Sequence, residues 1–152
     1  MRCLLFILCL STIAFTPLAA APEDDVAAAT QAWAEAFNTR DPERVLALYE
    51  TDAVLWGTTS ASLRNTPATR REYFSTMPQR PNQRVMIGEQ QIRVFGDVAV
   101  NSGTYTFANN QDGKVTSNHA RFSFTYVRKG DRWMIVDHHS SAVPSPPPAV
   151  AK

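Results

Sequence analysis

The sequence predicts an α+β domain in which a curved antiparallel sheet wraps around helices from the first half of the chain. Helix patterns and one short strand occupy residues 22–80, and long strands with alternating side chains occupy residues 84–141. Helices that precede a strand meander in this way favour a sheet with helices on one face. A strongly curved sheet with helices across its mouth would leave a conical cavity.

Residues 1–21 have the features of a signal peptide. Arg2 supplies the charged start, residues 4–15 form an apolar run, and residues 18–21 offer small side chains for cleavage. The run is too short to span a membrane, and no later segment supplies a span. We therefore expect a periplasmic or secreted protein that has no membrane contact after cleavage.

Cleavage would leave about 131 residues, a usual length for one domain. Both cysteines, Cys3 and Cys9, leave with the signal, so the mature chain has no disulfide and no cysteine metal site. Loss of Arg2 from the 15 basic residues leaves as many as the 14 acidic ones, which argues against nucleic acid as a partner. We expect one domain over residues 22–143 and a disordered Pro-rich tail over residues 144–152.

Three helix starts can be read in the first half of the chain. The acids at residues 23–25 suit the positive end of a helix dipole. Asp41–Pro42 and Thr66–Pro67 each combine a capping side chain with a proline at the first helical position. The first helix carries an apolar stripe at helical spacing, made of Val26, Ala29, Trp33, Ala36 and Phe37.

The ends of the later helices are predicted from the same spacing. The second helix is expected to run to Thr51–Asp52, and a short strand follows over residues 53–56. The third helix is expected to end near Met77, before two prolines. The buried face of the second helix would consist of Val45, Leu48 and Tyr49.

Residues 84–108 predict two paired strands, 84–95 and 98–108, with Gly88 as a bulge in the first. The second strand carries apolar side chains on both faces, since Val98 and Val100 oppose Ala99, Tyr105 and Phe107. A large uncovered apolar face is not tolerated in a soluble monomer. We therefore expect a homodimer, or a higher assembly, through the sheet face opposite the helices.

Residues 120–144 predict a hairpin whose turn decides which side chains share a face. A three-residue loop at residues 129–131 would place Arg121 opposite His139 and Ser123 opposite Asp137. A two-residue loop would shift the register by one and place Arg121 opposite Ser140. In the first register we expect Arg121, Asp137, His139 and Ser141 to line the cone.

These side chains suggest a site. Arg121 could hold a carboxylate through its bidentate fork, and His139 beside Asp137 could act as a general base with a raised pKa. An Arg121–Asp137 ion pair and a histidine bonded to a backbone carbonyl are the structural alternatives. His138 has the opposite parity and is expected to face a dimer partner.

Large aromatic side chains could line the pocket or simply fill the core. Tyr49 and Tyr105 could also donate to a ligand oxygen. His119, Asp137 and His139 could form a two-histidine, one-carboxylate metal site. Nothing else in the chain supplies a fourth ligand, so we expect neither a metal nor a cofactor. The candidate aromatic residues are Trp33, Tyr49, Trp56 and Tyr105.

Three stretches carry a resemblance to a known family: AEAFNTRDPERVLALYETDAVLWG, VFGDVAVNSGTYTF and RFSFTYVRKGDRWMIVDHHSSAVP. They resemble the nuclear-transport-factor-2-like (NTF2-like) superfamily, and most of all bacterial proteins similar to the association domain of calcium/calmodulin-dependent protein kinase II. The most specific piece is G-x-W-x-I-V-x-x-H-x-S-x-x-P, present here over residues 130–144 with one residue inserted after the glycine. The resemblance implies a cone-shaped α+β fold, a dimer through the outer sheet face and a small-molecule pocket inside.

The superfamily contains ketosteroid isomerases, dehydratases, cyclases and assembly domains, so the fold does not decide the chemistry. Of the pocket arginines in the kinase association domain, one falls on Ser140 here, and another corresponds only approximately to Arg121. Two functions follow from the residues and the resemblance. The first is an exported domain that binds a small ligand, which could bear a carboxylate, or that assembles with itself. The alternative is an isomerase, dehydratase or cyclase that uses His139 and Asp137 as acid and base.

Overall fold

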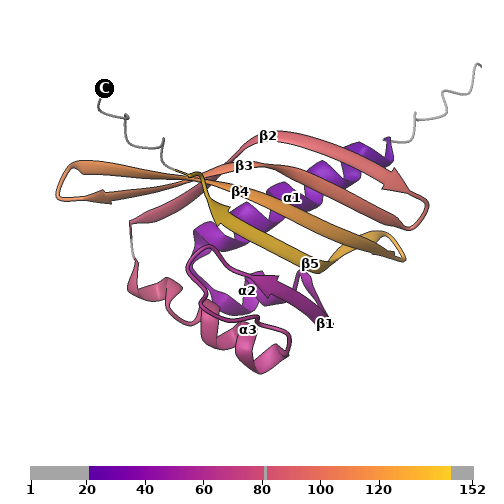
Figure 1. Ribbon diagram of the computed structural model, residues 1–152, viewed down its shortest axis with the longest axis horizontal. Coiled ribbons are helices and arrows are strands. Elements are labelled where there is room, and N and C mark those ends of the chain that lie inside the picture. Colours follow the sequence, from indigo (N-terminus) through magenta and orange to yellow (C-terminus); the bar gives the residue numbers. More distant parts are fainter. Residues whose placement is uncertain (1–20, 81, 145–152) are drawn as a thin grey trace, which may run out of the picture.

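The computed structural model describes residues 21–80 and 82–144, which form a curved, open sheet with helices packed against one face (Figure 1). The expected signal peptide and most of the Pro-rich tail lie outside the described residues. The sheet has the strand order β1-β5-β4-β3-β2. Its strands are β1 (Tyr49–Trp56), β2 (Gln83–Phe95), β3 (Val98–Gln111), β4 (Lys114–Lys129) and β5 (Arg132–Ala142).

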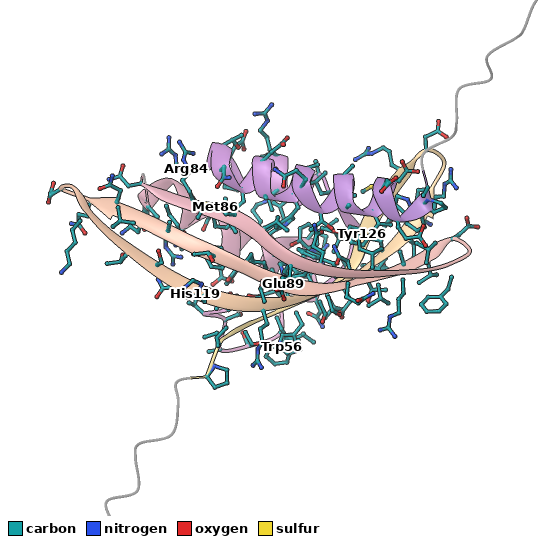
Figure 2. The ribbon with its side chains drawn as sticks, turned by 90° about the horizontal axis from the view of Figure 1, so that it is seen from above. Trp56, Arg84, Met86, Glu89, His119 and Tyr126 are labelled. Carbon is teal, nitrogen blue, oxygen red and sulfur yellow. The ribbon has the colours of Figure 1, made fainter. Side chains whose placement is uncertain are left out.

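The helices begin where the capping residues predict. In α2 (Pro42–Leu46) the Asp41 carboxylate accepts the Glu43 N–H at 2.9 Å. In α3 (Pro67–Phe74) Thr66 and Thr69 form a reciprocal capping box. The long helix α1 (Pro22–Thr39) crosses the inner face of the sheet and buries most of its predicted stripe (Figure 2). No helix in the described ranges is long and apolar enough to cross a membrane.

The expected end of the second helix was wrong. The helix ends at Leu46, and Tyr49 begins β1 rather than closing a helical turn. The reason is pairing with a strand from the far end of the chain. β1 runs parallel to β5, Tyr49 lies opposite Ile135, and the Ile135 N–H donates to the Leu48 carbonyl at 2.9 Å. The third helix also ends early, at Phe74, and a 3-10 turn at Met77–Gln79 follows it.

The antiparallel meander of β2 to β5 is confirmed. The predicted bulge is present, because the β2–β3 register shifts between Ile87 and Gln90. β3 continues to Gln111, past the predicted strand end at residue 108, and β4 begins at Lys114, so the turn between them is Asp112–Gly113, both with positive φ. Glycine adopts this backbone region at little cost.

Neither predicted register of the last hairpin is correct. Lys129 pairs with Arg132, so the loop has two residues. Farther along, Tyr126 pairs with Ile135 and Thr125 pairs with Asp137, which leaves Val136 as an extra residue in β5. Beyond this bulge the register is shifted by one residue more than the two-residue loop alone would give. β5 therefore returns to the alternation that a three-residue loop would have produced. Arg121 therefore lies opposite Ser141, and Ser123 lies opposite His139.

Candidate functional site

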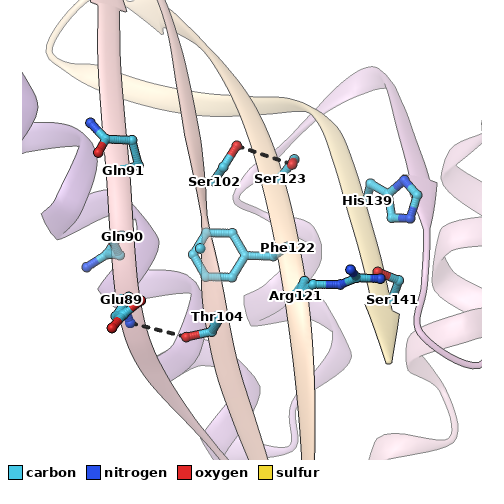
Figure 3. A pocket seen from close by; sticks show the side chains of 11 residues that line it. Glu89, Gln90, Gln91, Ser102, Thr104, Arg121, Phe122, Ser123, His139 and Ser141 are labelled. Atoms are coloured by element: carbon cyan, nitrogen blue, oxygen red, sulfur yellow. Dashed lines mark hydrogen bonds between the residues drawn. The ribbon is translucent and has the colours of Figure 1, made fainter. Parts of the chain in front are cut away.

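The bulge at Val136 decides which polar side chains enter the cone. His138 is 2% exposed and Ser140 is 6% exposed, and both lie on the inner face with the aromatic core. Arg121 and His139 are exposed on the outer face of the sheet (Figure 3). The expectation that Arg121 and His139 line the cone is therefore wrong, and so is the expectation that His138 faces outward.

His138 ends a buried chain of hydrogen bonds. The Trp33 indole N–H donates to the Tyr49 hydroxyl at 3.0 Å, and this hydroxyl lies 2.7 Å from Nδ1 of His138. Indole nitrogen can only donate, so the Tyr49 oxygen accepts from it. In the tautomer in which Tyr49 donates its own hydrogen to Nδ1, the proton of a neutral His138 sits on Nε2. That atom is buried and has no hydrogen-bond partner among the described residues.

Burial keeps this histidine neutral. Desolvation, aided by the nearby His139, lowers the pKa of His138 to about 3. The ring stacks on Phe124 at 4.0 Å between centroids and meets Trp33 edge-on at 5.2 Å. Burial also raises the pKa of Tyr49 well above its usual value. The inner wall of the cone therefore offers neutral donors rather than charges.

A second set of hydroxyl groups lies around Tyr105. Its ring is 1% exposed, and its hydroxyl oxygen has no hydrogen-bond partner among the described residues. Burial raises the pKa of this hydroxyl, and the Ser140 and Thr58 hydroxyls beside it lower the pKa in part, although neither has the geometry of a hydrogen bond to it. Ser140 and Thr58 hydrogen-bond to each other. Tyr105 thus presents an unpaired polar atom inside the cone.

The mouth of the cone holds a cavity of about 660 Å³. Its walls are mostly apolar and include Phe37, Phe74, Met77 and Phe107, and Thr58 connects it to the hydroxyl set around Tyr105. Two arginines line the rim. Arg64 pairs with Glu72 at 2.9 Å, whereas Arg80 has no ion pair among the described residues. The mouth can therefore receive a small molecule with an apolar body and an anionic end.

Arg70 is buried but serves the fold. Its guanidinium donates to the backbone carbonyls of Glu50, Thr51 and Ala53, at 3.0 and 2.7 Å for the first two. Burial lowers the pKa of Arg70. These bonds fasten α3 to β1. Both terminal nitrogens are thereby engaged with the backbone, although the buried Nε has no hydrogen-bond partner among the described residues.

The outer face carries the residues that the sequence singled out for catalysis. A groove of about 850 Å³ crosses it, with Arg121, Ser123, His139 and Ser141 along one side (Figure 3). Asp137 is half-buried on this face next to β1. Burial raises the pKa of Asp137, and the neighbouring His139 lowers it in part. Asp137 and His139 are thus brought together, but outside the cone.

The remaining candidates divide between the two faces. Trp33, Tyr49 and Tyr105 are buried in the cone wall, whereas Trp56 is 43% exposed on the outer face (Figure 2). His119 is also exposed, and its Nδ1 lies 3.0 Å from the Thr106 hydroxyl. The alternative metal site is not formed, because no group of three suitable side chains among the described residues could hold an ion.

Sequence reasoning missed the inner groups Thr58, Ser140 and the inward-facing His138. The His-Ser ending of the motif pointed to this strand end. Its residues were assigned to the wrong face because nothing in the sequence pattern marks the apolar residue Val136 as a bulge. Arg70 was missed because it occupies a helix position that reads as solvent-exposed.

The fold is that of the NTF2-like proteins with a cystatin-like architecture. A 1.16 Å structure of such a protein from Novosphingobium aromaticivorans superposes with a TM-score of 0.72 at 14% identity, covering 83% of this chain and 84% of the other. The chain belongs to the calcium/calmodulin dependent protein kinase II association domain family, whose sequence pattern matches residues 22–144.

A crystal structure from Xanthomonas campestris, described as an association domain of that kinase, is 33% identical, with a TM-score of 0.72 over 88% of this chain and 99% of the other. The kinase hub of S. rosetta is 14% identical, with a TM-score of 0.71 over 83% and 100%. A protein from Streptomyces avermitilis described as an NTF2-like dehydratase is 16% identical, with a TM-score of 0.73 over 80% and 96%. No curated protein matches the chain in sequence.

Proposed function

We propose that this chain is an exported, self-associating domain that pairs through the outer face of its sheet and holds a small ligand in its cone. The observation that carries the proposal is an apolar row across four strands of the uncovered face. Phe95 lies beside Val98, Val98 beside Val127, and Val127 beside Met134. We call these four residues the apolar row.

The apolar row is not covered by any described part of the chain. Phe95 is 62% exposed and Val98 is 40% exposed, and Trp56 and Met86 add further exposed apolar surface on the same face. Contiguous apolar surface of this kind marks an interaction site. Relatives described as an association domain and as a kinase hub support a second copy of the chain as the occupant.

The ligand part of the proposal is supported by the unpaired polar atoms of the cone. A buried donor or acceptor without a partner costs about 1–3 kcal/mol. The His138 Nε2 and Tyr105 hydroxyl atoms both bear this cost. Neither residue lines the cavity itself, but Thr58 does and hydrogen-bonds to Ser140, so a ligand acceptor that reached past Thr58 would remove this cost. Arg80 at the rim suits a carboxylate. This rim arginine takes the anchoring role that the sequence had suggested for Arg121.

The enzyme alternative receives less support. Asp137 and His139 lie on an open sheet face, where water screens charges and nothing encloses a substrate in a single copy. The cone itself contains neutral donors, and the histidine that lies inside it, His138, has a pKa of about 3, too low for a general base near neutral pH.

Sedimentation equilibrium tests self-association. We expect a dimer or larger assembly at micromolar concentration, and we expect Val98→Asp to dissociate it, because it places a charge in the apolar row. Ala32→Asp is the matched control, since Ala32 is exposed on α1. A monomeric wild-type protein, or a Val98→Asp variant that stays assembled, would refute pairing through this face.

A further inference from the structure

We propose that the two copies pair about a two-fold axis that runs along the strands between β3 and β4, so that Arg93 of each copy meets the partner's Asp137. This inference rests on the proposed self-association through the outer face. It adds the orientation of the two copies and the charged contacts that fix it.

The strand register arranges the outer face in rows that cross the sheet. Next to the apolar row lies a charged row, Arg93–Val100–Thr125–Asp137, with Val54 of β1 beyond it. Next comes a polar row, Gln91–Ser102–Ser123–His139, with Trp56 beyond it. Each row takes one residue from each of the strands β2, β3, β4 and β5.

Two identical faces that pack against each other need a two-fold axis lying in the plane between them. The axis can take any direction in that plane, but only an axis along the strands or across them keeps the strands of the two copies aligned. An axis along the strands between β3 and β4 leaves every row facing itself, but exchanges β2 with β5 and β3 with β4. A residue on β2 then meets the partner's β5 residue of the same row, and a residue on β3 meets the partner's β4 residue.

This exchange matches the apolar and polar rows. In the apolar row, Phe95 meets the partner's Met134 and Val98 meets the partner's Val127, so apolar surface covers apolar surface. In the polar row, Gln91 meets the partner's His139, which pairs an amide with an imidazole. Small side chains meet at the centre, where the polar row contributes Ser102 and Ser123 and where the groove hollows the face.

The charged row supplies opposite charges. Its two charged side chains lie at opposite ends, on β2 and β5, and strand spacing separates them by about 14 Å within one copy. They cannot pair there, and among the described residues neither forms an ion pair; the two ion pairs present are Arg64–Glu72 and Arg71–Glu43. The exchange brings Arg93 onto the partner's Asp137 twice per dimer.

An axis that runs across the strands, over the polar row, fits less well. It would place the apolar row over the row that contains Met86, Thr106 and His119, and would therefore bury valines against a polar histidine. It would also place His139 against the partner's His139, so that no amide would face the imidazole. Arg93 would then meet the partner's Glu89 instead of Asp137, which gives the experiment a specific alternative.

Charge reversal in two separate variants tests the orientation. Arg93→Glu and Asp137→Arg each place like charges together at both contacts, so we expect each variant alone to dimerise at least about tenfold more weakly. In an equimolar mixture, one copy of each variant restores opposite charges at both contacts. We expect the mixture to form heterodimers with an affinity within about threefold of the wild type, measured by sedimentation equilibrium. Circular dichroism verifies that each variant is folded.

A control and three outcomes that would overturn the inference complete the experiment. The control is Arg44→Glu, which reverses the charge of an exposed side chain on α2 and should leave the affinity unchanged. If Arg93→Glu is rescued by Glu89→Arg rather than by Asp137→Arg, the axis runs across the strands and the inference is overturned. It is also overturned if Val98→Asp dissociates the wild-type dimer but the mixture stays monomeric; pairing through the outer face would then stand without this orientation. A monomeric wild type overturns both.

Discussion

His138 and His139 are neighbours in the chain but face opposite sides of the sheet, one hydrogen-bonded to Tyr49 inside the cone and the other open to solvent. Alternation alone gives this opposition, but not which of the two turns inward. The bulge at Val136 makes that choice. It gives the interior a neutral imidazole and leaves His139 exposed on the outer face.

Acid should destabilise the fold through His138. The folded state keeps this ring neutral down to a pKa of about 3, whereas an unfolded chain protonates it near pH 6.5. Between these values the unfolded state binds one more proton, so the free energy of unfolding falls as the pH falls. The slope from this group is at most about 1.4 kcal/mol per pH unit.

Urea unfolding at fixed protein concentration between pH 4 and 7 measures this slope. In His138→Phe the slope should decrease by about the amount assigned to one proton. His119→Phe, which removes an exposed histidine, is the matched control and should keep the wild-type slope. Equal slopes in the wild type and His138→Phe would contradict a buried, neutral His138.

Tyr49→Phe should destabilise the domain by about 2–4 kcal/mol. The substitution removes one hydroxyl that serves two buried groups, the Trp33 N–H and the His138 Nδ1. Thermal denaturation followed by circular dichroism would measure the effect. Tyr73→Phe is the control, because this side chain is half-buried and its hydroxyl has no such pair of partners among the described residues. It should shift the melting temperature little. If the melting temperature of Tyr49→Phe falls as little as that of Tyr73→Phe, the hydrogen bonds from Trp33 through Tyr49 to His138 do not contribute as described.

Arg70→Lys should also be costly, by about 2–4 kcal/mol, although the charge is kept. A lysine ammonium cannot reach the carbonyls of Glu50, Thr51 and Ala53 in the geometry of the planar guanidinium fork. Arg71→Lys, next to it in α3, changes an exposed side chain that pairs with Glu43 and should cost less than about 1 kcal/mol. Chemical denaturation of both variants gives the comparison.

Local signals predicted most of the fold. Asp41–Pro42 and Thr66–Pro67 predicted two helix starts, and alternation assigned the inner and outer faces of β3 correctly. The misses came from long-range pairing. The spacing of Val45, Leu48 and Tyr49 fits a helix, but hydrogen bonding of the Leu48 carbonyl to β5 ends it early.

The candidate site was less predictable than the fold. Its chemistry depends on the parity of β5, and a single extra residue reverses that parity. Val136 has no glycine or proline signature that would mark it as a bulge. The bulge therefore accounts for the wrong side given to His139. Arg121 was misassigned for another reason, since β4 turns its alternate residues Phe122 and Phe124 inward and leaves Arg121 outside.

Tyr105 and Tyr126 provide a paired test of whether the cone is shaped for a ligand. Both rings are almost fully buried and both side chains carry a hydroxyl. The Tyr126 hydroxyl bonds to the Thr30 hydroxyl at 2.9 Å, whereas the Tyr105 hydroxyl has no partner among the described residues. Removal of a paired hydroxyl loses a hydrogen bond, but removal of an unpaired one also removes its desolvation cost.

We therefore expect Tyr126→Phe to destabilise the protein by about 1 kcal/mol and Tyr105→Phe to leave its stability unchanged or higher. Urea unfolding of the purified protein measures both. A residue that is retained at a cost to stability is expected where function requires it. If Tyr105→Phe instead destabilises the protein as much as Tyr126→Phe, the Tyr105 hydroxyl is already paired inside the cone and is not free to bind a ligand.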